Sequence, residues 1–167
     1  IDASASADFD ETVDVSVLVP VLNEAADIRD TLASMRAQRF PGRVEFLLID
    51  GRSEDGTRAI VEEVAREDDR FRLLDNPERG IPQALNIGLR ESRGRFIARM
   101  DAHALYPADY LERGVRRLEQ GGAEYVTGTQ LPHGVDAGSR RTALALDSPL
   151  GVGGADELVW LPGEAPE

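Results

Sequence analysis

The chain has 167 residues and no cysteine, and its 31 acidic and 19 basic residues give a formal net charge of −12. This length fits a single domain on the usual expectation of ~100–200 residues per domain. The lack of cysteine excludes disulfides, zinc–thiolate sites and thiol catalysis. The acidic balance argues against a protein that coats nucleic acid, because phosphate contacts need clustered basic side chains.

No apolar run approaches the ~18–20 residues that cross a bilayer, and the first residues lack the pattern of a signal peptide. We therefore expect a cytoplasmic protein. Acidic residues gather at both ends: residues 1–14 contribute −5 and residues 154–167 contribute −4 to the net charge. We expect a flexible acidic lead-in over 1–12, a globular domain over 13–154 and an irregular tail over 155–167.

The first half of the expected domain alternates between strand and helix. A β-branched run over 13–19 is stopped by Pro20, and a helix with an apolar face follows, for which we expect Asn23 to be the N-cap. An almost continuous apolar strand covers 44–49, as is typical of a strand that is buried on both faces. After a polar turn, a second helix is predicted from Thr57 onward.

The second half continues the alternation. The pattern predicts a short strand over 71–74, a helix over 82–94, a strand over 96–100 and a helix over 107–120. A fifth strand is expected at Tyr125 and Val126. Repeated strand–helix units predict an α/β fold with a mainly parallel sheet and helices on both faces.

In open sheets of this kind, ligands bind beyond the carboxyl ends of the strands. That rule selects three segments, 20–24, 50–53 and 101–103, because each follows a predicted strand directly. We expect Pro20, Asp50 and Asp101 to lie at the same edge of the sheet.

The segment Met100-Asp101-Ala102-His103 is the strongest candidate for chemistry. A carboxylate and an imidazole two residues apart can point at one divalent cation, and nitrogen suits Mn²⁺ better than Ca²⁺. Such an ion could bridge to a diphosphate. The alternative is that Asp101 caps a turn and His103 is an ordinary surface residue.

The other candidate residues each have a structural alternative. Asp50 could accept a hydrogen bond from a base or ribose, or cap its loop. Arg79 precedes a predicted helix, and an arginine beside a helix N-terminus can hold phosphate, although most single loop arginines are merely solvated. The segment 20–24 could present backbone groups and Glu24 to a ligand, or be a strand stop followed by a helix start.

Together these segments resemble the family 2 glycosyltransferases of the GT-A fold. The opening strand with Pro20-Val21-Leu22-Asn23-Glu24 is similar to that family's first strand and its Pro-x-x-Asn-Glu motif. The stretches 48–57 and 80–88 are similar to its second strand and turn and to its third helix. The stretch 99–111 is similar to the subgroup that makes bacterial exopolysaccharides such as succinoglycan. The resemblance covers about residues 13–154.

The resemblance implies metal-dependent, inverting hexosyl transfer from a nucleotide-diphosphate donor, such as a UDP-sugar, to a glycan or lipid-linked acceptor in polysaccharide biosynthesis. It implies that the donor is bound by six residues: Pro20, Val21, Glu24, Asp50, Arg79 and Asp101. It implies a divalent metal, Mn²⁺ or Mg²⁺, at Asp101 and His103, and it is compatible with peripheral association at the inner face of the membrane.

The chain departs from the family at two places. The family usually has aspartate where His103 stands, so one negative charge is missing at the expected metal. Beyond residue 154 the resemblance to the acceptor-binding half ends, so no catalytic base is assigned. A nucleotide-sugar-binding module without catalytic activity is therefore the alternative function.

Two other α/β classes fit the sequence less well. A nucleotidyltransferase would carry a glycine-rich, basic loop after its first strand, where this chain has Val21-Leu22-Asn23-Glu24. A signalling receiver domain would need a lysine after a late strand, and the chain contains no lysine.

Overall fold

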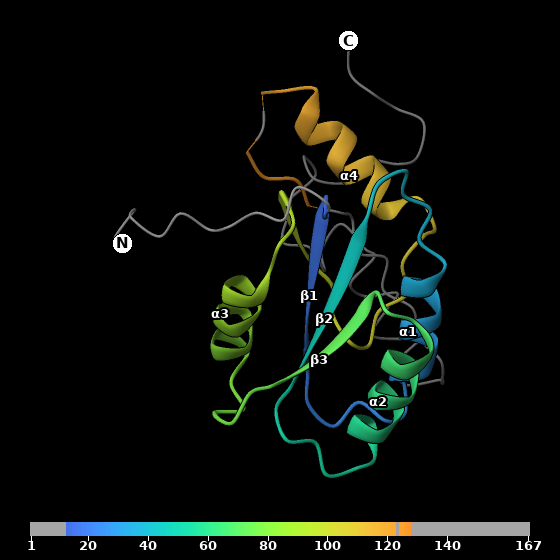
Figure 1. The fold of residues 1–167 in the computed structure, drawn as a ribbon, viewed down its shortest axis with the longest axis vertical. Coiled ribbons are helices and arrows are strands. Elements are labelled where there is room, and N and C mark those ends of the chain that lie inside the picture. Colours follow the sequence, from blue (N-terminus) through green and yellow to red (C-terminus); the bar gives the residue numbers. More distant parts are fainter. Residues whose placement is uncertain (1–12, 123, 128–167) are drawn as a thin grey trace, which may run out of the picture. The chain divides into compact units, whose positions relative to one another are not determined.

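The computed structural model describes residues 13–122 and 124–127 (Figure 1). In this part of the chain, four strands alternate with four helices, all of them in a unit that ends at Gly121. In chain order they are β1 (Val15–Val21), α1 (Ile28–Arg36), β2 (Val44–Asp50), α2 (Thr57–Glu67), β3 (Phe71–Asp75), α3 (Ile81–Glu91), β4 (Phe96–Arg99) and α4 (Tyr110–Glu119).

The strands form one parallel sheet in the order β3-β2-β1-β4. The register places Val21 beside Asp50, and Asp50 beside Asp75 of β3. On the other side of β1, the N–H of Met100 donates to the carbonyl of Leu18 at 3.1 Å. The α/β fold with a parallel sheet is thus confirmed, and the ends of β1, β2 and β4 meet at one edge, which we call the carboxyl edge.

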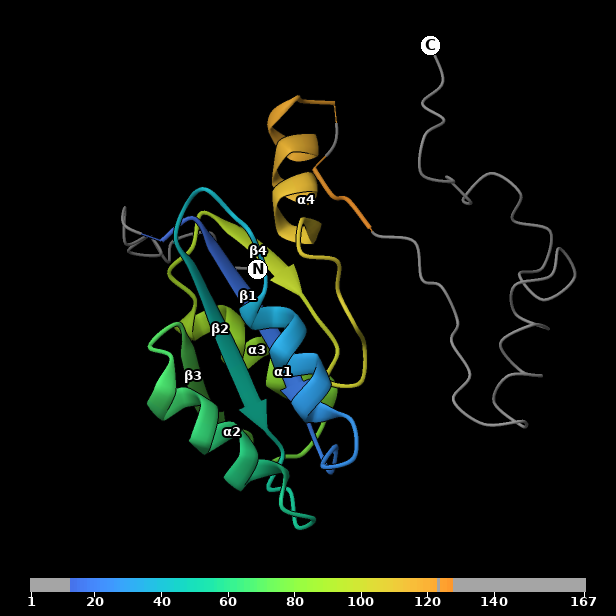
Figure 2. The ribbon, with the colours of Figure 1, turned by 90° about the vertical axis from the view of Figure 1, so that its right-hand side faces the viewer.

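Helices cover both faces of the sheet, as predicted (Figures 1 and 2). On one face, α1, α2 and α4 bury apolar side chains against β1 and β2, with Ile28, Leu32 and Met35 of α1 at the centre. On the other face, α3 packs Ala84 against a smaller cluster of Leu18, Leu47 and Ile49. Because β1 and β2 are covered on both sides, their near-continuous apolar sequences are explained.

The packing of α3 depends on Gly88. A Cβ atom at this position would lie 2.9 Å from Cδ2 of Leu18 and 3.2 Å from Cδ1 of Ile49. An alanine at this position would therefore require the buried side chain of Leu18 to shift.

The structure corrects three expectations at the ends of elements. Asn23 is not an N-cap: α1 begins only at Ile28, and Asn23 has a positive φ of 55° and bonds to another loop instead. The last helix begins at Tyr110 rather than at residue 107. Tyr125 and Val126 form no strand, because residues 124–127 have no ladder partner among the described residues.

The expected lead-in over 1–12 and tail over 155–167 lie outside the described residues. Residues 123 and 128–154 of the expected 13–154 domain lie outside them as well. None of the described helices has both the length and the apolar character needed to cross a membrane.

Candidate functional site

Two loops of the carboxyl edge are tied together by hydrogen bonds. The backbone N–H of Asn23, in the loop between β1 and α1, donates to Oγ of Ser53 at 2.9 Å. In return, Oδ1 of Asn23 accepts the N–H of Glu54 at 2.8 Å. Next to this pair, the N–H of Glu24 donates to Oγ1 of Thr57 at 2.8 Å. The loop after β1 therefore takes its shape from the loop after β2.

The loop between β3 and α3 joins the same structure. The N–H of Asn76 donates to the carbonyl of Asp50 at 2.8 Å, and the Arg79 guanidinium lies 3.1 Å from the Glu54 carboxylate. Gly51 sits between the loops: a Cβ there would lie 3.2 Å from Leu22 and 3.4 Å from the Cα atom of Arg79. We call the three loops, residues 22–27, 51–56 and 76–80, the loop clasp.

Backbone strain is concentrated in the loop clasp. The non-glycine residues with positive φ in the described chain are Asn23, Arg52 and Arg79, with φ of 55°, 59° and 63°, one in each loop. This conformation is costly for residues with a Cβ atom and persists only where surrounding contacts enforce it. Such strain is typical of functional sites, although it does not by itself say which ligand binds.

Asp50, the last residue of β2, is buried next to the loop clasp. Its side chain is 0% exposed, and its oxygens accept bonds from Oγ of Ser53 at 2.6 Å and from the Arg58 guanidinium at 3.3 Å. The Asp50 carboxylate is enclosed by these partners in this conformation, and its contact with a base or ribose stays a prediction. Sequence analysis missed Arg58, whose position eight residues later carries no local signal.

Asp55 binds the first residue of α2, Thr57. Its carboxylate accepts bonds from the hydroxyl and N–H of Thr57 and from the N–H of Ala25. These bonds favour the charged form, and the hydrogen bond from the Thr57 side chain is the largest cause that lowers the pKa of Asp55 below its usual value of 3.8. Asp55 thus stays ionised and links the loop after β1 to α2.

Asp101 follows β4 and is held by its neighbours. Its Oδ1 lies 3.0 Å from Nε and 2.9 Å from Nη2 of Arg99, the last residue of β4. The backbone N–H of Asp101 donates to the Tyr106 hydroxyl at 2.6 Å, and burial raises the pKa of that phenol. The carboxylate that we expected to bind a metal is therefore already neutralised by an arginine that sequence analysis did not select.

His103 meets Glu24 across the carboxyl edge. Its Nδ1 lies 3.1 Å from Oε1 of Glu24, although 79 residues separate the two along the chain. The side chain of His103 is 61% exposed and that of Glu24 is 24% exposed, so both remain accessible to a ligand. Two of the predicted site residues are thus brought together by the end of β1 and the loop after β4.

The remaining predicted residues differ in what they can offer. Val21 is 3% exposed and its carbonyl accepts the N–H of Gly51, so its side chain belongs to the core. Pro20 is half-buried at the end of β1, and the Arg79 side chain is 42% exposed although it is paired with Glu54.

The chemistry of the donor set permits a cation but does not complete its coordination. Asp101 offers oxygen and His103 nitrogen, a combination that suits Mn²⁺. Among the described residues, no group of three His, Asp or Glu side chains could hold a metal ion by itself. A cation held by Asp101 and His103 would have to take its other ligands from a bound phosphate or from water.

Comparison with known proteins decides the family. The chain matches the family described as "Glycosyl transferase family 2" over residues 16–160. The chain belongs to this family. The succinoglycan biosynthesis protein ExoA of Rhizobium meliloti (strain 1021) is 36% identical over 141 residues, which is 83% of this chain and 43% of that protein. The glycosyltransferase AglE of Haloferax volcanii is 32% identical over 131 residues, 75% of this chain and 43% of that one.

Solved structures show the same fold. The mannosyltransferase PcManGT from Pyrobaculum calidifontis, solved with GDP-Man and Mn²⁺, is 32% identical with a TM-score of 0.59, over 69% of this chain and 35% of that chain. S. aureus TarS residues 1–349, solved with UDP, is 22% identical with a TM-score of 0.60, over 72% of this chain and 39% of that chain. The GT-A fold is confirmed, and this family 2 chain spans less than half the length of the relatives it matches.

Proposed function

We propose that this chain forms the donor-binding part of an inverting glycosyltransferase, which moves a sugar from a nucleotide diphosphate to a glycan or lipid-linked acceptor in polysaccharide biosynthesis. The observation that carries the proposal is the meeting of Glu24 and His103 at the carboxyl edge of a family 2 sheet. Ligands of open parallel sheets bind at this edge. The relatives named for polysaccharide or glycan synthesis support the choice of reaction.

Each predicted site residue has a proposed part in donor binding. Pro20 and Glu24 line one side of the nucleoside, and Val21 shapes the edge from within the core. Asp50 organises the loop that faces the nucleoside and contacts it only if its bond to Ser53 is exchanged. Arg79, exposed at the start of α3, offers its guanidinium to the diphosphate.

Asp101 and His103 would hold a divalent cation beside the diphosphate. A cation there supplies positive charge to the leaving nucleotide as the glycosidic bond breaks. Arg99, already against Asp101, stabilises the carboxylate before a donor arrives. An acceptor hydroxyl attacks the anomeric carbon from the face opposite the nucleotide, and the nucleotide leaves. The hydroxyl proton passes to a general base, a role that we assign to none of the described residues.

The donor class is expected to be a UDP-sugar. TarS was solved with UDP-GlcNAc and PcManGT with GDP-Man, so both bases occur among proteins of this fold. A direct comparison of UDP-GlcNAc with GDP-mannose on the full chain decides between them.

The test is calorimetric titration of each donor with Mn²⁺, with Mg²⁺ and with chelator. We expect UDP-sugar binding that requires the cation and that Asp101→Ala abolishes, whereas the control Asp109→Ala, an exposed carboxylate before α4, leaves it unchanged. Donor affinity that is undiminished in chelator, for wild type and Asp101→Ala alike, would remove the metal from the proposal. No binding of either donor under any condition would contradict the proposed function.

Transfer is measured separately from binding. Release of UDP in the presence of an acceptor glycan or lipid supports the glycosyltransferase, whereas tight donor binding without release of UDP supports the binding module.

A further inference from the structure

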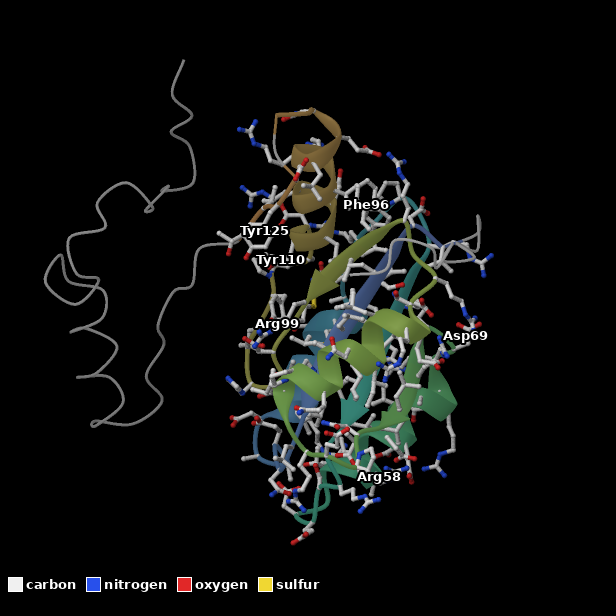
Figure 3. The ribbon with its side chains drawn as sticks, turned by 90° about the vertical axis from the view of Figure 1, so that its left-hand side faces the viewer. Arg58, Asp69, Phe96, Arg99, Tyr110 and Tyr125 are labelled. Atoms are coloured by element: carbon white, nitrogen blue, oxygen red, sulfur yellow. The ribbon has the colours of Figure 1, made fainter. Side chains whose placement is uncertain are left out.

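Arg58 lies in the first turn of α2 and reaches back to two strands of the sheet. Its Nη1 is 3.3 Å from Oδ2 of Asp50 at the end of β2 and 2.5 Å from Oδ1 of Asp75 at the end of β3. Its Nε is 3.0 Å from Glu62, one turn further along α2. Figure 3 shows Arg58 at the end of the sheet opposite to Phe96, where β4 begins. Arg58 therefore belongs to the carboxyl edge.

The two carboxylates that Arg58 bridges are neighbours in the sheet. Asp50 and Asp75 are partners in the register of β2 and β3, so their side chains emerge on the same face. Asp50 is fully buried, and a buried carboxylate is costly unless it is paired. Within the described residues, Arg58 is the only cation in hydrogen-bond distance of Asp50. Arg58 thus offsets both the burial of Asp50 and its repulsion from Asp75.

From Asp50, hydrogen bonds lead into the loop clasp. Ser53 donates its hydroxyl to Asp50 and uses the same oxygen to accept the N–H of Asn23. Asn23 in turn accepts the N–H of Glu54, whose carboxylate pairs with Arg79. All three strained, positive-φ residues belong to the loops that this network joins. Without a fixed Asp50, Ser53 would lose the acceptor of its hydroxyl and of its backbone N–H and would keep only its bond from the N–H of Asn23.

We propose that Arg58 is a positioning residue for the nucleotide-sugar donor: it orients Asp50, and through Asp50 it holds the loop clasp in the shape that binds the nucleoside. Arg58 itself does not touch the donor. The proposal rests on the proposed function of the carboxyl edge, and it assigns a role to a side chain that contacts Asp50 and not the donor. The third contact, with Glu62, anchors the guanidinium to α2.

The charge on Arg58 is constant over the range in which the protein is studied. The hydrogen bond to Asp75 is the largest cause that raises the pKa of Arg58 above its ordinary value. Any pH dependence of donor binding near neutrality therefore arises elsewhere, and the role of Arg58 must be tested by substitution.

The central variant is Arg58→Met, which keeps the length of the side chain and removes its charge and donors. We expect UDP-sugar affinity to fall roughly tenfold, which corresponds to a loop clasp that keeps its donor-binding shape in about a tenth of the free molecules. Arg58→Lys should recover part of the loss, because one ammonium can meet one carboxylate but not bridge both as the guanidinium does. The matched control is Arg66→Met on the same helix, where Nε of Arg66 bonds to the carbonyl of Glu62.

Hydrogen exchange gives a second readout that needs no donor. In Arg58→Met, the amides of Asn23 and Glu54 should exchange faster, while those in the centre of β1 stay protected. In an Asp50→Asn background, Arg58→Met should cause little further loss of affinity, because the charge that it serves is already gone.

The outcomes separate this inference from the proposed function. The inference is overturned if Arg58→Met has the donor affinity and the hydrogen exchange of the wild type. If Arg58→Met fails to fold, the inference is overturned when Arg58→Lys binds the donor as tightly as the wild type. Equal loss of affinity in the Arg66→Met control would also overturn it. If the wild type binds no donor, the proposed function fails, and hydrogen exchange still decides whether Arg58 holds the loop clasp.

Discussion

At the residue scale, the contacts of Arg99 and His103 determine which ligand atoms of the expected metal site are free to bind a cation. The side chains of Arg99 and Asp101 are both partly exposed, so their ion pair contributes little to stability. It nevertheless occupies the oxygen that a cation would use. In the same way, Glu24 occupies Nδ1 of His103 and leaves Nε2 as the ring nitrogen to face a ligand. The site is therefore organised by protein contacts before any cation binds.

Arg99→Ala should tighten Mn²⁺ binding measured without donor. The substitution frees Oδ1 of Asp101 and removes a positive charge next to the cation, and for an exposed pair we expect an effect of about two- to fivefold. Free Mn²⁺ can be followed by electron paramagnetic resonance. Arg95→Ala, at the other end of β4, is the control and should have no effect. Weaker Mn²⁺ binding in Arg99→Ala would contradict this role.

His103→Asp should shift the metal preference from Mn²⁺ towards Mg²⁺. The change replaces a nitrogen ligand by a hard oxygen ligand and places a carboxylate beside Glu24. Donor binding should then depend more strongly on a cation, because two carboxylates must be neutralised. Titration of the donor with each ion measures the preference, and an unchanged ratio of the two affinities would exclude His103 from the metal site.

At the element scale, α3 and α4 respond oppositely to the loss of a glycine. Gly88→Ala should destabilise the protein by about 1–3 kcal/mol, because the new methyl group would overlap Leu18 beneath α3. Gly114→Ala in α4, where a Cβ meets nothing within 4 Å, should stabilise by about 0.5–1 kcal/mol. Urea unfolding measures both free energies, and stabilisation by Gly88→Ala would refute the close packing of α3.

The start of α2 makes a second prediction at this scale, on pH. Since hydrogen bonds lower the pKa of Asp55 in the folded state, its stabilising effect is present above pH 3.8 and is lost as pH falls through the lower folded pKa. Asp55→Ala should therefore lower Tm at pH 7, and the difference from wild type should shrink below pH 3.8. A constant difference down to pH 2 would show that the charge is not involved.

At the scale of the whole molecule, separate polar networks hold the two ends of the sheet. At the amino end, Glu45 is 6% exposed and accepts the Ser16 hydroxyl at 2.6 Å and the guanidinium of Arg72 at 3.1 Å. Glu45→Ala should cost about 2–3 kcal/mol of unfolding free energy and leave donor affinity unchanged, because the loop clasp lies at the other end. A parallel loss of donor affinity, measured by calorimetry, would show that the two ends are coupled.

The four strands and four helices of the described chain, their parallel arrangement and the segments at the carboxyl edge were all predictable from the sequence, although a further strand at Tyr125 and Val126 was not confirmed. Local hydrophobic pattern was enough for this, since apolar runs that end in polar turns depend on residues that are adjacent in the chain. It also indicated the family through its motifs. The start of α1 was misjudged because Asn23 bonds to Glu54, a partner that no local pattern reveals.

The pairing of charged side chains could not be predicted without the three-dimensional arrangement of the strands and helices. The strand order β3-β2-β1-β4 brings Asp75 beside Asp50 and places Arg58 between them, and it joins Glu24 to His103. Asp50 is also buried, whereas the sequence left open whether it contacts a ligand or caps its loop and the family resemblance implied a contact with the donor. These pairings depend on which strands are neighbours in the sheet and on the distance of each helix from the sheet. Both are set by packing between segments rather than by the residues of one segment.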